Sequence, residues 1–251
     1  MSKVLTRRQF VATTAGLLGL ALGDSQAASS PPPDARASGA PAPRTVVLFQ
    51  GDSITDAWRD RKVVSANQGA GLGTGYAFLI AAGALRDHPE ARLRFFNRGI
   101  GGSRLPDLQA RWDAEALALR PNIVSIMIGV NDFWHKLTRG YTGTVADYEK
   151  QYTALLQRTR QALPKARIVV IEPFVLRCGE IDERWFPEFD QRQAVAARVA
   201  KRSGATYVPL QEMLTSLARE TSPEYWAWDG AHPTAAGDAA IAERWRQVVG
   251  L

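Results

Sequence analysis

The sequence predicts an α/β protein in which a five-stranded parallel sheet lies between two layers of helices, a three-layer α/β/α sandwich. Two observations lead to this fold class. Short apolar runs that are rich in β-branched or aromatic residues alternate along the chain with longer amphipathic stretches. Strands that are apolar throughout and separated by helices are typical of parallel sheets, because each connecting helix packs back onto a face of the sheet.

The predicted strands are short and are bounded by Gly, Pro or Asn. They are residues 46–49 (VVLF), 93–96 (LRFF), 123–128 (IVSIMI), 168–171 (IVVI) and 206–208 (TYV). The predicted helices carry apolar residues at helical spacing and are residues 75–87, 105–119, 145–163, 187–203 and 234–249. In the third of them, Tyr148, Tyr152 and Leu155 share one face and Glu149 and Lys150 point away, which predicts one buried side.

The composition favours one ordinary domain. The chain has 251 residues, of which 45% are hydrophobic, and this is enough for a core without disulfides. The single cysteine, Cys178, excludes an intramolecular disulfide and a cysteine-rich metal site. The formal charge of +6 comes from basic residues that are spread along helical stretches and form no block, so we expect no nucleic-acid partner.

The N-terminal residues have the features of an export signal. Arg7 and Arg8 precede an apolar run at residues 11–22, and small residues follow at 25–28. This order predicts a twin-arginine signal peptide, residues 1–27, that is cleaved after Ala27. A membrane anchor is the alternative, but the run is shorter than the roughly 20 residues that span a bilayer. We expect export to the periplasm or the medium, without stable membrane insertion after cleavage.

The next residues predict a linker. Residues 28–43 are rich in Pro, Ala and Ser and contain too few large apolar side chains to form a core. The folded domain should therefore comprise residues 44–251.

Polar and glycine-rich segments follow the predicted strands. Ser53 comes after the first strand, a glycine-rich segment at 99–103 after the second, and Asn131 after the third. Asp229 and His232 directly precede the last helix. Because ligands bind at the carboxyl ends of parallel strands, we expect these residues at one edge of the sheet.

Each of these signals has a simpler interpretation when it is taken alone. Asp52 and Ser53 are ordinary helix N-caps, and Asn131 is a common turn residue. The segment 99–103 resembles a phosphate-binding loop, but it lacks the Gly-Lys-Ser/Thr ending and does not follow the first strand as a dinucleotide fingerprint does. The combination of all four segments is what favours a catalytic site.

Together these residues predict a serine hydrolase. A hydroxyl becomes a good nucleophile when an imidazole takes its proton, and the imidazole needs a carboxylate to orient it and to stabilise its cation. Ser53, His232 and Asp229 have the side chains for these three roles. The oxyanion needs hydrogen-bond donors, for which the backbone N–H groups of Ser53 and Gly102 and the side-chain amide of Asn131 are the candidates.

At this point the sequence resembles the SGNH, or GDSL-type, hydrolase superfamily, whose four blocks carry Ser, Gly, Asn and His in that order. The matching segments are 51–55 (GDSIT), the glycine-rich loop that ends at Gly102, 129–132 (GVND) and 229–233 (DGAHP). The resemblance covers residues 45–250. It implies a flavodoxin-like fold, the SGNH hydrolase fold, and ester hydrolysis without a metal or another cofactor.

Within this superfamily the chain looks most like the acetylxylan esterase type of carbohydrate acetylesterase. The stretches that carry this finer resemblance are residues 51–61, 108–112, 127–134 and 227–229. The resemblance implies removal of acetyl groups from sugar hydroxyls through an acyl-enzyme on Ser53, and it is compatible with a homo-oligomer. His135 departs from the pattern, since a more strongly cationic residue is expected after Trp134.

Four residues near the motifs are predicted to contact the substrate, namely Asp52, Trp58, Trp134 and Trp228. The tryptophan faces could stack on pyranose rings, and their alternative role is to pack the edges of the core. The segment 174–189 mixes aromatic and charged residues and is a candidate lid over the cleft.

Three other functions would use the same sequence features. A lysophospholipase, thioesterase or broad-specificity carboxylesterase would use the same triad on another ester. An acyltransferase would pass the acyl group to an acceptor other than water. A carbohydrate-binding module without activity would keep only the scaffold, although the full set of catalytic residues argues against it. The expected partner is an acetylated carbohydrate or another small ester.

Overall fold

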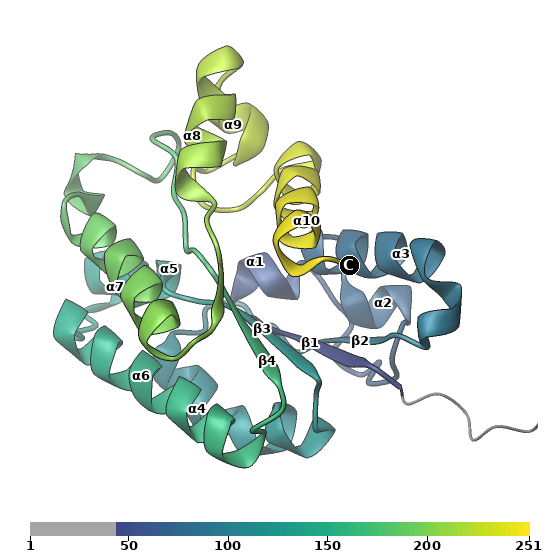
Figure 1. Ribbon diagram of the computed structural model, residues 1–251. Helices are drawn as coiled ribbons and strands as arrows, with labels where there is room; N and C mark the ends of the chain where they lie inside the picture. Colours follow the sequence, from purple (N-terminus) through teal and green to yellow (C-terminus); the bar gives the residue numbers. More distant parts are fainter. Residues whose placement is uncertain (1–43) are drawn as a thin grey trace, which may run out of the picture. The chain divides into compact units, whose positions relative to one another are not determined.

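The computed structural model describes residues 44–251, and the predicted signal peptide (1–27) and linker (28–43) lie outside the described residues. Five parallel strands form one sheet in the order β2-β1-β3-β4-β5 (Figure 1). The strands are β1 (Val46–Gly51), β2 (Arg94–Asn97), β3 (Ile123–Met127), β4 (Arg167–Ile171) and β5 (Thr206–Val208). Since β1 has β2 on one side and β3 on the other, the connections diverge at β1 and β3, which creates a crevice at the carboxyl ends of these two strands.

Helices cover both faces of this sheet. Side chains of α3 (Tyr76–Asp87) and α10 (Ala235–Val249) belong to the apolar cluster on one face. Side chains of α4 (Leu105–Glu115), α6 (Val145–Ala162) and α7 (Glu188–Arg202) belong to the cluster on the other face (Figure 1). The predicted three-layer sandwich with a flavodoxin-like strand order is therefore confirmed.

Alternation along the strands divides the core into these two clusters. In β1, Val47 and Phe49 belong to the cluster with α3 and α10, whereas Leu48 belongs to the cluster with α4 and α6. Successive side chains of a strand point to opposite faces, so a strand that is apolar throughout can contribute to both clusters. This is why the apolar runs identified the strands.

The predicted elements match the observed ones closely, and the ends of the strands agree within two residues. The predicted helix 105–119 is divided, because α4 ends at Glu115 and a separate 3-10 turn (Leu117–Leu119) follows it. Five helices were not predicted, and all of them lie between the elements above. They are α1 (Ser53–Asp56), α2 (Gly69–Leu72), α5 (Val130–Arg139), α8 (Gln211–Glu220) and α9 (Pro223–Trp226).

The loop after β2 packs directly against α1. A Cβ atom on Gly99 would lie 2.4 Å from the backbone nitrogen of Asp56, so only glycine allows this approach. Arg59 Nε donates a hydrogen bond to the Gly99 carbonyl at 2.9 Å, and the Gly101 N–H donates to Asp56 Oδ2 at 2.9 Å. These contacts hold the glycine-rich loop beside the start of α1.

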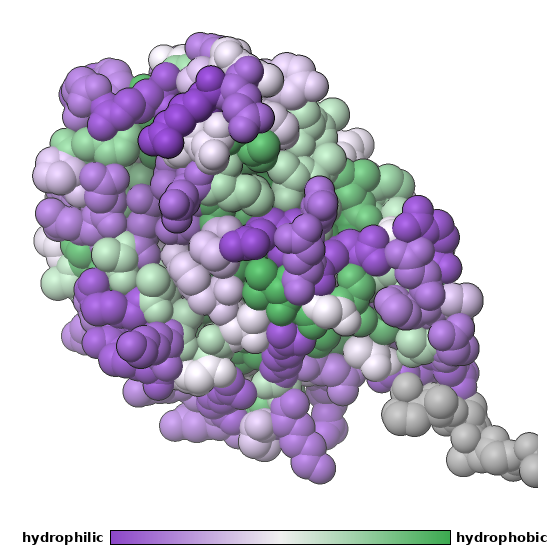
Figure 2. Space-filling view, turned by 45° about the horizontal axis from the view of Figure 1, so that its top comes forward, coloured by the Kyte–Doolittle hydropathy of each residue, from purple (hydrophilic) through white to green (hydrophobic). Residues whose placement is uncertain are grey.

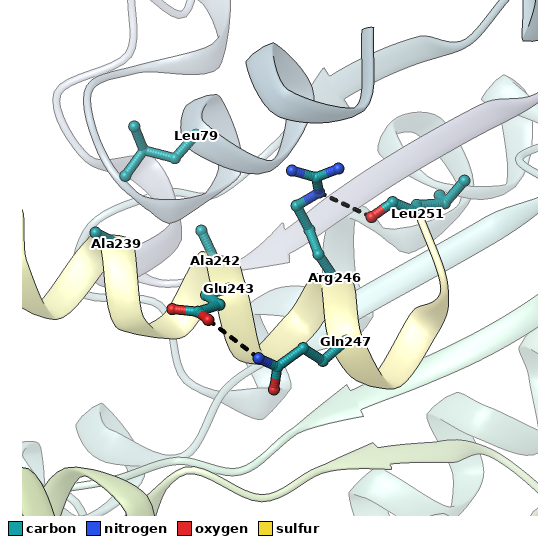
Figure 3. Close-up of a pocket in the computed structure, with 7 residues that line it drawn as sticks. All are labelled: Leu79, Ala239, Ala242, Glu243, Arg246, Gln247 and Leu251. Carbon is teal, nitrogen blue, oxygen red and sulfur yellow. Dashed lines mark hydrogen bonds between the residues drawn. The ribbon is translucent and has the colours of Figure 1, made fainter. Parts of the chain in front are cut away.

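Polar side chains cover most of the face that Figure 2 presents, with apolar residues exposed between them. At the end of α10, Arg246 Nε donates to the carbonyl oxygen of Leu251 at 2.8 Å (Figure 3). Arg246 and Leu251 also line a hollow of about 500 Å³, whose lining residues include none of the predicted site residues. In the part of the chain from residue 44 onward, no helix has both the length and the apolar character that crossing a membrane requires.

Candidate active site

The structure brings Ser53, His232 and Asp229 into one hydrogen-bonded chain. Ser53 Oγ lies 2.8 Å from His232 Nε2, and His232 Nδ1 lies 2.6 Å from Asp229 Oδ2. Ser53 and His232 are 179 positions apart in the sequence. They meet because α1 and the loop before α10 lie at the same edge of the sheet. A proton on Ser53 Oγ can therefore pass directly to the imidazole.

Local structure fixes each of the three side chains. Ser53 is the first residue of α1, and the Asp52 carboxylate caps this helix by accepting from the Ile54 N–H at 3.0 Å. Asp229 Oδ1 accepts from the backbone N–H groups of Ala231 at 3.0 Å and His232 at 2.7 Å, which is a tight local turn. The other oxygen of Asp229 thus points to the imidazole.

Two tryptophan rings contact the imidazole of His232. The ring of Trp228 stacks on it with centroids 5.6 Å apart and an angle of 19°, and the ring of Trp134 lies at 5.8 Å. Trp134 in turn contacts Trp185 edge-on at 5.5 Å. These contacts limit rotation of the imidazole and keep Nε2 directed at Ser53.

The electrostatics of the pair are those of an activated imidazole. The hydrogen bond to Asp229 raises the pKa of His232 above its ordinary value; burial opposes this, and the charges of Asp229 and Asp52 add to the rise. Burial tends to raise the pKa of Asp229, but hydrogen bonds from the His232 ring and from backbone N–H groups outweigh it and lower the pKa. Asp229 therefore stays ionised and stabilises the imidazolium that forms when His232 accepts a proton.

Two predicted oxyanion donors lie next to this chain, Gly102 in the loop after β2 and Asn131 in the first turn of α5. Gly102 has a φ of +77°, and within residues 44–251 its N–H donates to no other group. Asn131 Nδ2 donates to the carbonyl of Ser103 at 3.3 Å, which orients the amide and leaves its second hydrogen available. A Cβ atom on the neighbouring Gly101 would lie 3.8 Å from Ser53 Cβ, so the glycine loop borders the hydroxyl. This is a suitable environment for a developing negative charge.

Ser53 and His232 open into a hollow of about 1160 Å³. Trp58, 94% exposed, and Trp228, 62% exposed, for both of which a substrate contact was predicted, are part of its lining. Seven polar residues of the lining were not predicted as substrate contacts, namely Asp56, Arg59, Asp60, Arg61, Lys62, Thr74 and Asp238. The charged run at 59–62 directly after Trp58 is the sequence signal that could have identified four of them.

Two other predicted substrate contacts lie elsewhere. Asp52 is only 1% exposed, and its carboxyl lies beneath α1 as a helix cap, so the expectation that it contacts substrate is corrected. Trp134 lies against His232 and Trp185 and is absent from the lining of this hollow. Its position supports the alternative that this ring packs the edge of the core.

The segment 174–189, predicted as a candidate lid, packs into the protein instead of over the hollow. Most large apolar residues of segment 174–189 are buried, among them Phe174, Trp185 and Phe189. The Leu176 N–H donates to the Gly230 carbonyl at 2.7 Å, and the Glu180 N–H donates to the Asp229 carbonyl at 3.0 Å. The segment therefore supports the loop that carries Asp229 and does not form a cover over the hollow.

Among the described residues, no group of three or more His, Cys, Asp or Glu side chains is arranged to hold a metal ion. A hydroxyl, an imidazole and a carboxylate in sequence, beside uncommitted N–H donors, are typical of serine hydrolases. The fold and the site thus define an α/β hydrolytic enzyme.

Comparisons with known proteins agree with this class. Residues 49–240 match the model of the GDSL-like lipase/acylhydrolase family. The chain is 32% identical over 207 residues to an acetylxylan esterase of Geobacillus stearothermophilus, which covers 82% of this chain and 94% of the relative. The chain belongs to the GDSL-like lipase/acylhydrolase family, and it is a carboxylic ester hydrolase.

Solved structures show the same relationship. A candidate GDSL-like lipase from Parabacteroides merdae has a TM-score of 0.81 and 39% identity, over 82% of this chain and 95% of the other. The acetylxylan esterase Axe2 from Geobacillus stearothermophilus has a TM-score of 0.74 and 31% identity, over 82% and 94% of the two chains. Two further structures of Axe2 are of catalytic mutants in which a serine or a histidine is changed to alanine.

Proposed function

We propose that this enzyme removes O-acetyl groups from carbohydrate through an acetyl-enzyme on Ser53. The observation that carries the proposal is the continuous chain of short contacts from Ser53 Oγ through His232 to Asp229. The similarity to an acetylxylan esterase supports the substrate class. The existence of serine and histidine catalytic mutants of Axe2 supports the assignment of a serine and a histidine to catalysis here.

The geometry gives each group a role. His232 Nε2 takes the proton from Ser53 Oγ as the oxygen attacks the acetyl carbonyl, and the oxyanion accepts hydrogen bonds from Ser53 N–H, Gly102 N–H and Asn131 Nδ2. The protonated imidazole then gives its proton to the departing sugar oxygen. Water, deprotonated by the same imidazole, attacks the acetyl-enzyme. The imidazolium then returns this proton to the departing Ser53 Oγ as acetic acid is released, which restores the free enzyme. Asp229 holds the imidazole in position in both half-reactions.

The large hollow supports a sugar as the alcohol part of the ester. Trp58 and Trp228 present exposed aromatic faces at a hollow that also contains charged and hydroxyl groups. Aromatic faces bind the apolar faces of pyranose rings, while polar groups can bind the sugar hydroxyls.

The direct experiment is Ser53→Ala, measured with 4-nitrophenyl acetate and with an acetylated xylo-oligosaccharide. Loss of the nucleophile should lower kcat on the order of 10⁴- to 10⁶-fold. Ser216→Ala, which changes an exposed serine of α8, is the matched control and should keep the activity. Circular dichroism confirms that both variants are folded. Retention of activity by Ser53→Ala would exclude the proposed mechanism.

A second candidate is an esterase or lysophospholipase for longer acyl chains. The observation in its favour is that the large hollow also has an apolar part, formed by Ile54, Ala57, Trp58, Trp228 and Pro233. A series of 4-nitrophenyl esters from acetyl to octanoyl separates the two functions. A deacetylase should show its highest kcat/KM with acetyl, whereas a rise toward octanoyl would favour the second candidate.

We also propose export through the twin-arginine pathway, on the basis of Arg7, Arg8 and the apolar run at 11–22. Changing both arginines to lysine should retain the full-length precursor in the cytoplasm. Cell fractionation and N-terminal sequencing of the exported form measure this, and export of the double variant at the normal rate would contradict the route.

A further inference from the structure

A second, smaller hollow borders the glycine loop of the active site. Its volume is about 540 Å³. Gly102 lines it, whereas the adjacent Gly101 lines the large hollow. If the substrate carbonyl is held at the Gly102 N–H, the groups on either side of the ester can therefore extend into the two hollows.

The side chains around this small hollow have unused hydrogen-bonding capacity. Within residues 44–251, the Arg139 guanidinium, both ring nitrogens of His135, and the hydroxyls of Tyr141 and Thr142 make no hydrogen bond or ion pair. These residues lie at the C-terminal end of α5 and in the segment that follows it. Several uncommitted polar groups around one concave surface are the usual sign of a ligand site.

The charge of the small hollow is positive. Arg104 lies over the ring of Tyr141 at 4.4 Å and forms an ion pair with Asp107, in which Nε donates at 3.0 Å. Arg104 and Asp107 neutralise each other, so the exposed guanidinium of Arg139 is the uncompensated charge. Burial, and then the charges of Arg139 and Arg104, lower the pKa of His135, and the charge of Asp107 opposes this. His135, Arg104 and Arg139 line the same hollow.

We infer that the small hollow is a subsite for a carboxylate on the saccharide, so that the preferred substrates are acetylated saccharides that contain a uronic acid. The inference rests on the proposed function. One uncompensated guanidinium matches one planar carboxylate, to which it can donate two parallel hydrogen bonds. Tyr141, Thr142 and the neutral His135 supply donors for the remaining oxygen lone pairs and for neighbouring sugar hydroxyls.

The test compares an acetylated methyl uronoside with the corresponding acetylated methyl hexoside, which carries an uncharged CH2OH group in place of the carboxylate. We expect kcat/KM to be about 10-fold higher for the acid at low salt, the size expected for a partly exposed, charge-assisted hydrogen bond. The advantage should decrease as sodium chloride is raised to 0.5 M, because salt screens exposed charges. Equal values for the two substrates would overturn the inference.

Three variants locate the effect. Arg139→Gln should bring the ratio of kcat/KM for acid and neutral substrates to about 1, and Arg139→Lys should keep part of the preference because it keeps the charge but not the planar fork. Arg219→Gln removes an exposed positive charge from α8 and is the matched control, which should keep the full ratio. A preference that survives in Arg139→Gln places the carboxylate elsewhere and overturns the inference.

A binding measurement distinguishes failure of this inference from failure of the proposed function. Calorimetry with Ser53→Ala and the deacetylated methyl uronoside should show tighter binding than with the methyl hexoside, whether or not the enzyme hydrolyses acetylated sugars. If the neutral acetylated hexoside is hydrolysed with Ser53 dependence but no acid preference appears in rate or binding, only the carboxylate subsite is wrong.

Discussion

Asp52 holds a buried carboxyl next to Ser53. Its Oδ1 caps α1, and its Oδ2 is buried without a hydrogen-bond partner within residues 44–251. Burial raises the pKa of Asp52 to about 6, although the hydrogen bond from Ile54 and the charge of His232 oppose the rise. Above this pH the carboxylate adds a second negative charge near the imidazole and helps to raise the pKa of His232.

Two substitutions of Asp52 separate its cap from its charge. Asp52→Asn keeps an oxygen that can accept from Ile54 N–H but removes the charge, so the pKa of His232 should fall. Since the base acts when neutral, kcat/KM rises with pH as His232 loses its proton, and this acid limb should move to lower pH in Asp52→Asn. Rates with 4-nitrophenyl acetate from pH 5 to 9 measure the limb.

Asp52→Ala is the companion variant. It removes both the cap and the charge, so the free energy of unfolding should fall by about 1 kcal/mol in addition to the shift of the limb. If the acid limb of Asp52→Asn stays in place, the charge of Asp52 has no influence on the imidazole and the residue acts only as a helix cap.

At this scale the sequence predicts the residues that the structure brings together at the candidate site, but not those that surround them. Ser53, Gly102, Asn131, Asp229 and His232 lie in short motifs at strand ends, and parallel topology brings such ends together. The burial of Asp52 and the charged lining of the small hollow depend on how α1 and α5 pack against other elements. Those contacts are between residues distant in sequence and leave no local pattern.

The segment after β4 positions the loop that carries Asp229 and His232. A Cβ atom on Gly179 would lie 2.6 Å from the Cα atom of Asp229, and Gly179 has a φ of +56°. The backbone hydrogen bonds from Leu176 and Glu180 join the same two segments. A small displacement in this segment is therefore transmitted directly to the carboxylate.

Gly179→Ala should disturb both stability and catalysis. The left-handed backbone alone costs about 1 kcal/mol, and the contact with Asp229 must also move the loop. We expect kcat/KM for 4-nitrophenyl acetate to fall at least about 10-fold, since small displacements of catalytic groups have large effects on rate.

Gly250→Ala is the matched control for this prediction. Gly250 also has a positive φ, +79°, but no atom lies within 4 Å of a Cβ atom built on it. This variant should lose a similar amount of stability from backbone strain and keep its activity. Chemical denaturation and initial rates measure both quantities, and equal activity in the two variants would show that Gly179 does not position the catalytic loop.

Some helices have a clear apolar periodicity in the sequence, and others do not. The predicted helices bury one apolar stripe, so their periodicity is clear in the sequence. α5 buries Asn131, Asp132 and His135 as well as Val130 and Phe133, and these polar residues at buried positions hide the helical pattern. α8 has one fully buried residue, Leu214, which is too little signal for ten residues. The polar residues that α5 buries therefore made this helix harder to predict.

Across residues 44–251, two buried carboxyls, Asp52 and Asp132, and one half-buried carboxyl, Asp238, have raised pKa values. Burial raises the pKa of Asp132 to about 7 and that of Asp238 to about 7, in addition to the value of about 6 for Asp52. Each of them still accepts a hydrogen bond from a backbone N–H, of Leu105, Tyr76 and Ile54 respectively. The native state therefore keeps protons that the unfolded chain releases near pH 4.

These protons determine how stability depends on pH. When the native state binds more protons than the unfolded state, the free energy of unfolding falls as pH rises, by up to about 1.4 kcal/mol per pH unit for each proton. His232 acts in the same direction, because its pKa is higher in the folded state than in the unfolded chain. The stabilisation is fully present at pH values below the pKa of the unfolded chain, and it is lost as the pH rises through the pKa of the folded state. At the acid end, carboxyls with lowered pKa values, Asp107, Glu188 and Asp229, lose their stabilising partners as they are protonated.

The enzyme should therefore be more stable at pH 5 than at pH 8, as measured by urea unfolding of the full chain. Asp238→Asn keeps an oxygen that can accept from the Tyr76 N–H but no longer titrates, so the difference between the two pH values should become smaller. Glu220→Gln, an exposed carboxylate at the end of α8, is the control and should keep the difference. A stability that rises from pH 5 to pH 8 would mean that the buried carboxyls are ionised in the native state, with partners that outweigh their burial.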